Sequence, residues 1–328
     1  MHIVKRVLYL TTTTIDNSSA RSIQISNFTD VLSRICSLSV YSVNNNMRPA
    51  HFLKFLRSYF IEKPDAIVIR EVKVLPFLIF RRVTIILELH QKPSIFATKF
   101  LLIAQCFSRI QLVSISDALR MELSGLGCKN IYVAHDGIDT DKNRLNIRNF
   151  NSGVINIVHT GSLYKINTEW LIGAVKSILS SNENYSITLV GLTEIELDIF
   201  RDLKLKGLHL LPRVEYLESL RLQNSADILW YINDPSSEIS NYTSPLKLFE
   251  YFNTGRPVVC NRHGSIKEII DFKYPYAYEY RSTESLLSVI NNIAHNYTKA
   301  SKVSAMYRNQ LSENFSWKKR AEFFLSLI

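Results

Sequence analysis

The sequence lacks the features of several common protein classes. None of its apolar runs reaches the roughly 18 residues that a membrane-spanning helix needs, because charged residues such as Arg81 and Arg109 interrupt or flank them. The G-x-G-x-x-G pattern of dinucleotide-binding proteins is also absent, which argues against NAD as a ligand. The basic N-terminal segment runs straight into an expected strand without a small-residue cleavage site, so we do not expect secretion.

Cysteine is scarce, and its four copies lie far apart in apolar surroundings. They are Cys36, Cys106, Cys128 and Cys260. No two of them have the spacing of a metal site, and a few dispersed cysteines are typical of reduced cytoplasmic proteins. We therefore expect reduced core cysteines in a cytoplasmic protein.

The chain does have enough apolar residues for a large core. Its 328 residues are 46% hydrophobic, which indicates two globular domains of ordinary size. The net charge of +10 is concentrated in the first half: residues 1–150 hold 20 Lys and Arg against 11 Asp and Glu, hence +9, and residues 151–328 hold 19 against 18, hence +1. This asymmetry indicates an anionic partner for the first half, such as a nucleic acid, an anionic membrane surface or a phosphorylated acceptor.

Short apolar segments alternate with helical patterns along the first half. The expected strands cover residues 4–10, 38–43, 66–70 and 83–89. This alternation predicts a parallel α/β sheet, and the loops after its strands lie at the edge where such sheets bind ligands. His90 ends one of these strands, where a lone histidine is either a structural residue or a functional one. The polar stretch 142–153 predicts a linker.

The most informative stretch is residues 244–260, SPLKLFEYFNTGRPVVC. Ser244 is a favourable N-cap, and Pro245 is tolerated in a first helical turn. Gly255 can adopt the left-handed conformation that ends a helix, and the apolar run after it is typical of a buried strand. The stretch therefore predicts a short helix with both ends marked.

The two faces of this expected helix differ in polarity. One face carries Leu246, Phe249 and Phe252, and the other carries Lys247, Glu250, Tyr251 and Thr254. Lys247 and Glu250 are either a solvated ion pair, stabilising by about 0.2–0.5 kcal/mol, or ligands of a substrate. A lysine in the first turn opposes the helix dipole, so helix stability explains it poorly. A cation beside helix-start amides suits a diphosphate, and a carboxylate one turn later suits sugar hydroxyls.

At these residues the sequence resembles the retaining glycosyltransferases of the GT-B fold that are called group 1. The segments HDGID at 135–139 and LPRVEYLESLRLQNSADILWYI at 211–232 extend the resemblance over most of the chain. It implies two Rossmann-like α/β domains that face each other across a cleft. The acceptor-binding domain would be 1–148 and the nucleotide-sugar-binding domain 149–328, with a terminal helix, about 316–328, crossing back to the first domain.

The resemblance also implies a set of site residues. The donor site would comprise Gly161, Ser162, Lys165, Arg213, Val214, Thr243, Ser244, Pro245, Leu246, Lys247 and Glu250. The expected acceptor-binding residues are Ser18, Ser19 and Arg21, and the expected catalytic residues are His90, Lys247 and Glu250. In this assignment Glu250 binds the ribose, the helix start holds the diphosphate, and His90 lies close to the reacting sugar.

Two departures from the family pattern concern the diphosphate. Ser162 and Asn167 stand where the family has an arginine and a lysine that clamp this group, and Lys165 is the nearest cation. Asp139 and Asp141 form a D-x-D pattern, the metal-binding signature of a different glycosyltransferase fold. Such short acidic patterns are common, and this one lies in a loop that the resemblance already explains. We therefore expect no metal cofactor.

The sequence accordingly predicts an enzyme that transfers a sugar from a UDP- or GDP-sugar, with retention of configuration, to a glycan or polyprenyl-diphosphate-linked acceptor. Its expected role is bacterial surface polysaccharide synthesis. We expect it in the cytoplasm, bound peripherally to the anionic inner face of the cytoplasmic membrane, without a nucleic-acid partner. Two alternatives stay open. One is the same fold as a nucleotide-sugar epimerase or non-catalytic binding subunit, because of Ser162 and Asn167, and the other is a nucleic-acid-binding protein, because of the charge.

Overall fold

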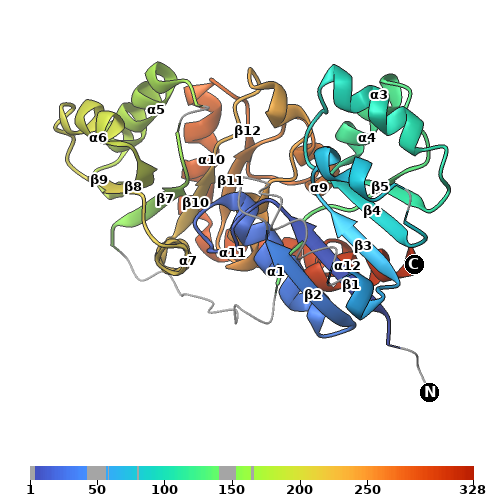
Figure 1. The fold of residues 1–328 in the computed structure, drawn as a ribbon. Coiled ribbons are helices and arrows are strands. Elements are labelled where there is room, and N and C mark those ends of the chain that lie inside the picture. Colours follow the sequence, from blue (N-terminus) through green and yellow to red (C-terminus); the bar gives the residue numbers. More distant parts are fainter. Residues whose placement is uncertain (1–3, 43–56, 58, 80, 140–152, 164–165) are drawn as a thin grey trace. The chain divides into compact units, whose positions relative to one another are not determined.

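The structure is a computed structural model that describes residues 4–42, 57, 59–79, 81–139, 153–163 and 166–328. The chain forms two compact units, each built on a parallel sheet (Figure 1), which confirms the prediction of two α/β domains. The first unit runs to Gly137 and includes Tyr242–Ser244 and Phe315–Ile328, and the second comprises Ile138–Asn241 and Pro245–Asn314. Most of the predicted linker lies outside the described residues.

The first unit is built on a six-stranded parallel sheet of order β2-β1-β3-β4-β5-β6. Its strands are β1 (Arg6–Thr11), β2 (Ser37–Ser42), β3 (Ala66–Ile69), β4 (Thr84–Leu89), β5 (Ile110–Ser114) and β6 (Ile131–Val133). Its connecting helices are α1 (Ala20–Ser33), the 3-10 helix η1 (Val72–Phe77), α3 (Ile95–Ala104) and α4 (Asp117–Gly125). The four strands predicted for this half are confirmed, with ends displaced by at most two residues.

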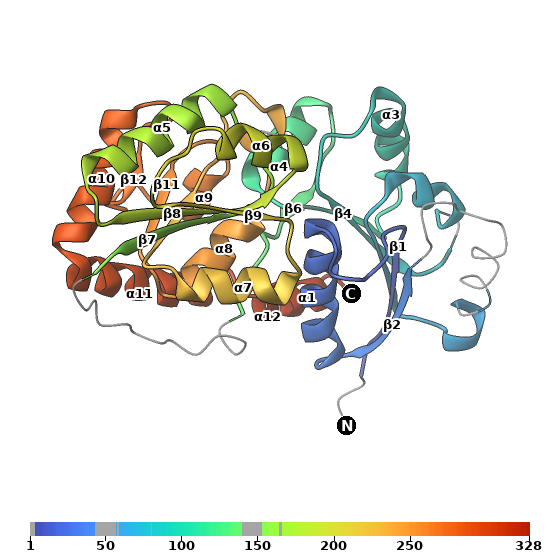
Figure 2. The ribbon, with the colours of Figure 1, turned by 90° about the vertical axis from the view of Figure 1, so that its left-hand side faces the viewer.

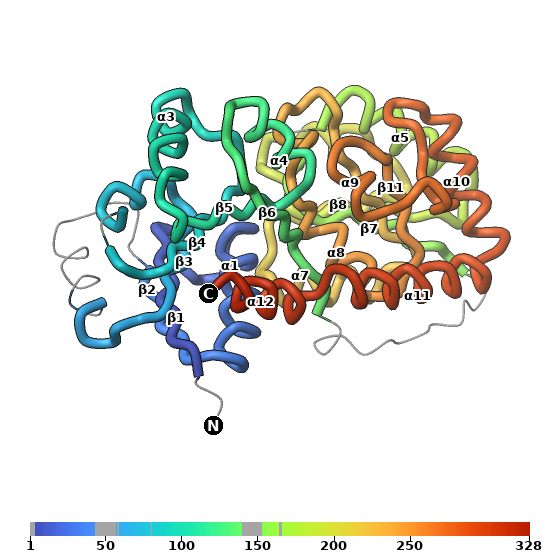
Figure 3. The backbone as a smooth tube through the Cα atoms, turned by 90° about the vertical axis from the view of Figure 1, so that its right-hand side faces the viewer, coloured from blue at the N-terminus to red at the C-terminus, as the bar shows by residue number. Residues whose placement is uncertain are grey.

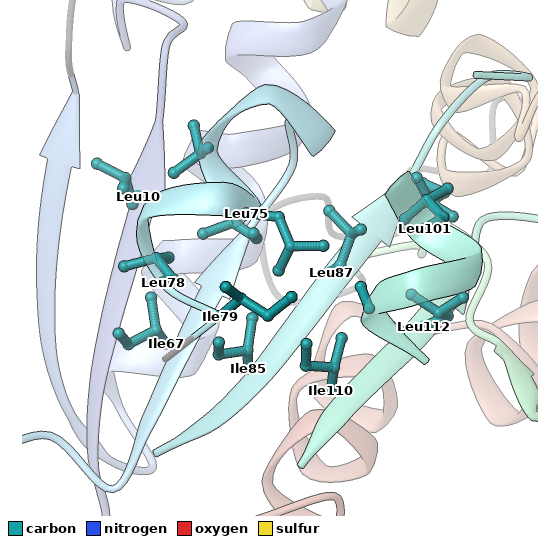
Figure 4. Packing of buried hydrophobic residues seen from close by; sticks show 14 of the residues in the cluster. Leu10, Ile67, Leu75, Leu78, Ile79, Ile85, Leu87, Leu101, Ile110 and Leu112 are labelled. Atoms are coloured by element: carbon teal, nitrogen blue, oxygen red, sulfur yellow. The ribbon is translucent and has the colours of Figure 1, made fainter. Parts of the chain in front are cut away.

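The core of the first unit includes the segment that follows β3 (Figure 4). All four residues of β3 are buried, as expected for a central strand of a sheet covered on both faces. Leu78 and Ile79 pack against Ile67 and Ile85 of the central strands. The strand order reverses between β1 and β3, so the loops after these two strands meet at a topological switch point, the usual position of a ligand.

The terminal helix α12 (Trp317–Ser326) belongs to the first unit. It packs against α1 (Figure 3). The rings of Phe28 on α1 and Phe324 on α12 meet edge to face with centroids 4.8 Å apart. Burial of both rings fixes α12 against the helix that follows β1.

The second unit has a six-stranded parallel sheet of order β12-β11-β10-β7-β8-β9. Its strands are β7 (Ile155–Thr160), β8 (Tyr185–Leu192), β9 (Leu208–Pro212), β10 (Ile228–Tyr231), β11 (Val258–Asn261) and β12 (Ala277–Tyr278). Its helices are α5 (Thr168–Ser181), α6 (Glu194–Arg201), α7 (Tyr216–Ser225), η2 (Glu238–Asn241), α8 (Leu246–Asn253), α9 (Ile266–Ile269), α10 (Thr283–His295) and α11 (Tyr297–Asn314). Helices α5 and α10 pack together over one face, and α8 and α11 over the other (Figure 2). The switch point of this sheet lies between β7 and β10.

Candidate active site

Helix α8 has an uncapped start and a well-defined end. Pro245 occupies the N-cap position, and no side chain caps the helix. The sequence predicts Ser244 in this role, but the Ser244 hydroxyl accepts a hydrogen bond from the backbone N–H of Asp136 at 2.9 Å, so this prediction is wrong. The predicted end is confirmed, because Gly255 follows the C-cap with a φ of 71° and β11 begins at Val258. No side chain therefore competes with an anion for the N–H groups of the first turn.

Lys247 and Glu250 lie one turn apart on α8. Lys247 Nζ is 3.7 Å from Glu250 Oε2. The Lys247 side chain is 32% exposed and that of Glu250 only 8%, and the other two residues of the predicted polar face, Tyr251 and Thr254, are also buried. This burial argues against a simple solvated ion pair. A carboxylate that has lost its water must recover hydrogen bonds from the protein or from a ligand.

Gln223 of α7 supplies one of these hydrogen bonds, and no sequence pattern points to it. Its Nε2 lies 3.3 Å from Glu250 Oε2, 3.1 Å from Thr160 Oγ1 and 3.3 Å from Ser219 Oγ. The Gln223 side chain is completely buried. Because the amide is neutral, it orients the carboxylate without cancelling its charge, and Glu250 keeps acceptor capacity for hydroxyl groups.

Strand β7 and helix α8 are joined at the switch point of the second sheet. The Tyr251 hydroxyl accepts a hydrogen bond from the backbone N–H of Thr160 at 2.7 Å. His159, one residue earlier, donates from Nδ1 to the carbonyl oxygen of Trp230 at 2.9 Å. Burial, together with the charge of Lys247, lowers the pKa of His159 to about 4, so its ring is neutral at pH 7.

Two glycines bring strand ends together beside Lys247. Gly161 and Gly191 have φ values of 132° and 102°, which side chains rarely permit. A Cβ on Gly191 would stand 2.9 Å from the carbonyl oxygen of Gly161, and one on Gly161 would stand 3.5 Å from Lys247 Cε. The predicted donor residues Gly161 and Lys247 therefore belong to one site.

Ser162 and Asn167, which stand where the family has an arginine and a lysine, lie in different surroundings. Asn167 is the N-cap of α5, and its Oδ1 accepts a hydrogen bond from the backbone N–H of Trp170 at 2.8 Å. This cap gives the asparagine a structural role. Ser162 is exposed directly after Gly161. Lys165 lies outside the described residues, and its role stays a prediction.

The remaining predicted donor residues are spread over two places. Arg213 and Val214 follow β9 and precede α7, so they lie at the opposite end of α7 from Gln223. Thr243 and Ser244 group with the first unit, whereas α8 belongs to the second. The structure therefore brings together Gly161, Lys247 and Glu250, and a donor role for the others stays a prediction.

The predicted catalytic residue His90 lies directly after β4 in the first unit. Its Nε2 is 2.6 Å from Glu88 Oε1, and Arg320 of α12 forms a buried ion pair with the same carboxylate. Burial raises the pKa of Glu88, but its interactions with His90, Arg320 and Arg70 outweigh burial and hold that pKa well below its usual value. Burial and the charge of Arg70 lower the pKa of His90 to about 4. At pH 7 an ionised carboxylate therefore accepts a hydrogen bond from a neutral imidazole.

The predicted acceptor residues lie after β1, at the switch point of the first sheet. Ser19 is the N-cap of α1, and its hydroxyl accepts a hydrogen bond from the N–H of Ser22 at 3.1 Å. The N–H of Ser18 donates to Asp16 Oδ1 at 2.9 Å, and Arg21 is exposed. Ser19 thus has a structural role, and acceptor binding by all three residues stays a prediction.

Residues 155–296, which contain the site on β7, α7 and α8, match the family described as glycosyl transferases group 1. The fold is similar to that of the Anabaena protein Alr3699/HepE in complex with UDP and glucose (TM-score 0.68, 14% identity, 98% of each chain). It is also similar to sucrose-phosphate synthase (tll1590) from Thermosynechococcus elongatus (TM-score 0.73, 10% identity, 98% of each chain) and to the apo form of the lipopolysaccharide outer core galactosyltransferase WaaB (TM-score 0.64, 12% identity, 98% of each chain). No curated protein matches the chain by sequence. Residues 155–296 of the second unit thus match a glycosyl transferases group 1 domain, and the chain shares the GT-B fold of these solved structures.

Proposed function

We propose that the chain transfers a sugar from a UDP- or GDP-sugar to a glycan or lipid-linked acceptor, with the donor bound by the second unit. The observation that carries this proposal is the pair of Lys247 and Glu250 on the uncapped helix α8. The Glu250 carboxylate, oriented by Gln223, accepts hydrogen bonds from ribose hydroxyls. Lys247 and the first-turn N–H groups of α8 bind the diphosphate. Similar folds in complex with UDP and with UDP-glucose support a nucleotide-sugar donor.

The proposed transfer retains the anomeric configuration and needs no metal cofactor. Lys247 and the start of α8 stabilise the charge of the departing diphosphate, which helps to remove the proton of the attacking hydroxyl on the same face of the sugar. Among the described residues no cluster of His, Cys, Asp and Glu suits a metal, and Asp141 lies outside them. Transfer that continues in EDTA is the expected result. Transfer that stops in EDTA and resumes with Mn²⁺ would contradict the metal-free route and favour Asp139 and Asp141 as metal ligands.

The proposed acceptor is linked to a polyprenyl diphosphate at the inner face of the cytoplasmic membrane and is bound by the first unit. This half of the chain carries the positive excess, +9 over residues 1–150, which suits an anionic surface. The name of one similar structure, the lipopolysaccharide outer core galactosyltransferase WaaB, supports a role in surface polysaccharide synthesis.

The exposed face of helix α3 supports the proposed membrane binding. Ile95, Phe96 and Ile103 are 82%, 83% and 59% exposed, and the exposed Lys99 falls between them on the same face of the helix. In the described part of the chain, no helix is long and apolar enough to cross a membrane. An exposed apolar stripe with a cation in it suits shallow, reversible binding to anionic lipid.

Calorimetric titration of the full chain with UDP, GDP and their sugar derivatives tests the donor site. Glu250→Gln should weaken donor binding about tenfold, or about 1.4 kcal/mol, because a charged acceptor of ribose hydroxyls is lost while the shape is kept. Asp198→Asn is the matched control, since Asp198 pairs with Arg201 at the same three-residue spacing on α6 but is exposed. Unchanged donor affinity in Glu250→Gln would contradict the assignment.

A further inference from the structure

The terminal helix brings a charged side chain into the interior of the first unit. Arg320 of α12 is only 4% exposed. Its Nη2 donates to the Glu88 carboxylate, and its Nη1 donates to the backbone carbonyl oxygens of Ala134 and His135. The guanidinium also lies over the Phe28 ring, 5.5 Å from its centroid. These contacts hold the arginine in one orientation.

Glu88 stands between Arg320 and His90. Its Oε1 accepts hydrogen bonds from Arg320 Nη2 and from His90 Nε2, the latter at 2.6 Å, and its Oε2 is 3.4 Å from the Tyr9 hydroxyl. An ionised carboxylate can only accept, so the single ring proton of neutral His90 is on Nε2. His90 Nδ1 then carries a lone pair, and it has no partner among the described residues. The His90 side chain is 15% exposed, so Nδ1 is available to a ligand.

We propose that Glu88 and Arg320 are positioning residues that hold His90 in its Nε2-protonated tautomer, with Nδ1 as a hydrogen-bond acceptor for a sugar hydroxyl. The identity of this ligand rests on the proposed function. An imidazolium, or the other tautomer, would present a donor at Nδ1 and could not accept that hydroxyl proton. Arg320 keeps the carboxylate ionised, and the carboxylate fixes the ring.

The other groups around this pair do not replace Arg320. The further charged or titratable residues whose charges act on Glu88 or on its neighbours are Tyr9, Arg70, Glu71 and Asp136. Arg70 hydrogen-bonds Gln24 at 3.1 Å. Over the described ranges it makes no ion pair with Glu88, whereas Arg320 does. Arg320 is therefore the guanidinium that binds the Glu88 carboxylate directly, while Arg70 acts on His90 through its charge.

Nitrogen-15 NMR of the histidine rings reads this tautomer directly in the full-length protein. The His90 signals are assigned by their loss in His90→Gln. At pH 7 the wild-type ring should carry its proton on Nε2. In Arg320→Met the midpoint of His90 titration should rise, because a neighbouring positive charge is removed. In Glu88→Gln a fraction of His90 should move to the Nδ1-protonated tautomer, because an amide can also donate to Nε2.

The control and the kinetic readout separate positioning from general damage. Lys319→Met removes an exposed cation from the same helix and should leave the His90 signals unchanged. If Arg320→Met does not fold, Glu88→Gln and Arg320→Lys carry the test. With a competent donor and acceptor, Glu88→Gln should lower kcat about tenfold or more while KM for the donor stays within about twofold.

Two outcomes distinguish this inference from the proposed function. A wild-type ring protonated on Nδ1, or signals unaffected by both Glu88→Gln and Arg320→Met, overturns the positioning role even if sugar transfer is observed. If the expected tautomer is observed but no nucleotide-sugar supports transfer, the proposed function is overturned and a sugar hydroxyl is no longer the ligand. The positioning of His90 by Glu88 and Arg320 is then still supported.

Discussion

Gln223 on α7 donates a hydrogen bond of 3.3 Å to the Glu250 carboxylate on α8. Lys247 is farther from the same oxygen, at 3.7 Å. Of these two groups, the neutral amide is thus the nearer to this buried carboxylate oxygen. Glu250 consequently keeps its negative charge largely for a ligand, which is what recognition of ribose hydroxyls requires.

Gln223→Ala should weaken donor binding without unfolding the second unit. The substitution leaves Glu250 short of a hydrogen bond and free to turn, which should cost about 1–2 kcal/mol of binding, or about 5- to 30-fold in Kd. Calorimetry with the preferred nucleotide measures the change. Asn224→Ala is the control, because the Asn224 side chain donates to the carbonyl of Leu220 in its own helix and to no other residue that the structure describes. Equal losses in both variants would point to damage of α7 instead.

Gly191→Ala should destabilise the protein and disturb the donor site. At φ of 102° the new Cβ would stand 2.9 Å from the carbonyl oxygen of Gly161, so the backbone beside Lys247 must move, at a cost of about 1–3 kcal/mol. Urea unfolding measures this cost. Gly173→Ala on α5, where a Cβ meets nothing within 4 Å, should instead be neutral or stabilise by up to about 1 kcal/mol. A neutral Gly191→Ala would show that the approach of the two strand ends is not needed.

Local chemistry explains which parts of the fold could be predicted from the sequence. Gly255 and the strand after it were accessible because a left-handed residue and an apolar run are properties of neighbouring residues. Ser244 shows the limit: its partner Asp136 lies 108 positions away, and a capping preference contains no information about such a competing contact. The role of Asn167 as the cap of α5 is a local feature by contrast, and the family pattern, which has a lysine at this position, does not indicate it.

The same distinction holds for the candidate site. Lys247 and Glu250 could be paired from sequence because helical spacing places them on one face. Gln223 and Thr160 could not be added from sequence. Gln223 meets Glu250, and Thr160 meets Gln223, only when the parallel sheet brings α7, β7 and α8 to one edge. The long-range bond from Arg320 to Glu88, 232 positions apart, was inaccessible for the same reason.

Stability should fall as the pH drops from about 6.5 towards 4, in part because of His159. Its pKa in the folded protein is about 4, below the usual 6.5, so in this window the unfolded chain binds a proton that the folded chain does not. One such group changes the free energy of unfolding by at most about 1.4 kcal/mol per pH unit. Urea unfolding at pH 7, 6 and 5 should show a shallower loss in His159→Gln than in the wild type. His209→Gln, at an exposed position on β9, is the control, and parallel curves for all three proteins would contradict the assignment.

Membrane binding should depend on the exposed face of α3 as well as on net charge. The double substitution Ile95→Ser and Phe96→Ser removes two highly exposed apolar side chains, so stability should be unchanged while co-sedimentation with anionic vesicles weakens about tenfold or more. Lys99→Gln should weaken the free energy of vesicle binding by about 1 kcal/mol at low salt. The loss should be smaller as salt rises, because screening weakens the attraction to lipid headgroups.

Leu217→Ser on α7, a 67% exposed apolar residue of the second unit, is the control and should pellet like the wild type. Equal pelleting of the wild type with neutral and anionic vesicles, or none with either, would contradict an anionic-lipid surface on the first unit. Retained binding by the double variant would move that surface away from α3, because the charge of the chain is unaltered and only its apolar contact has been removed.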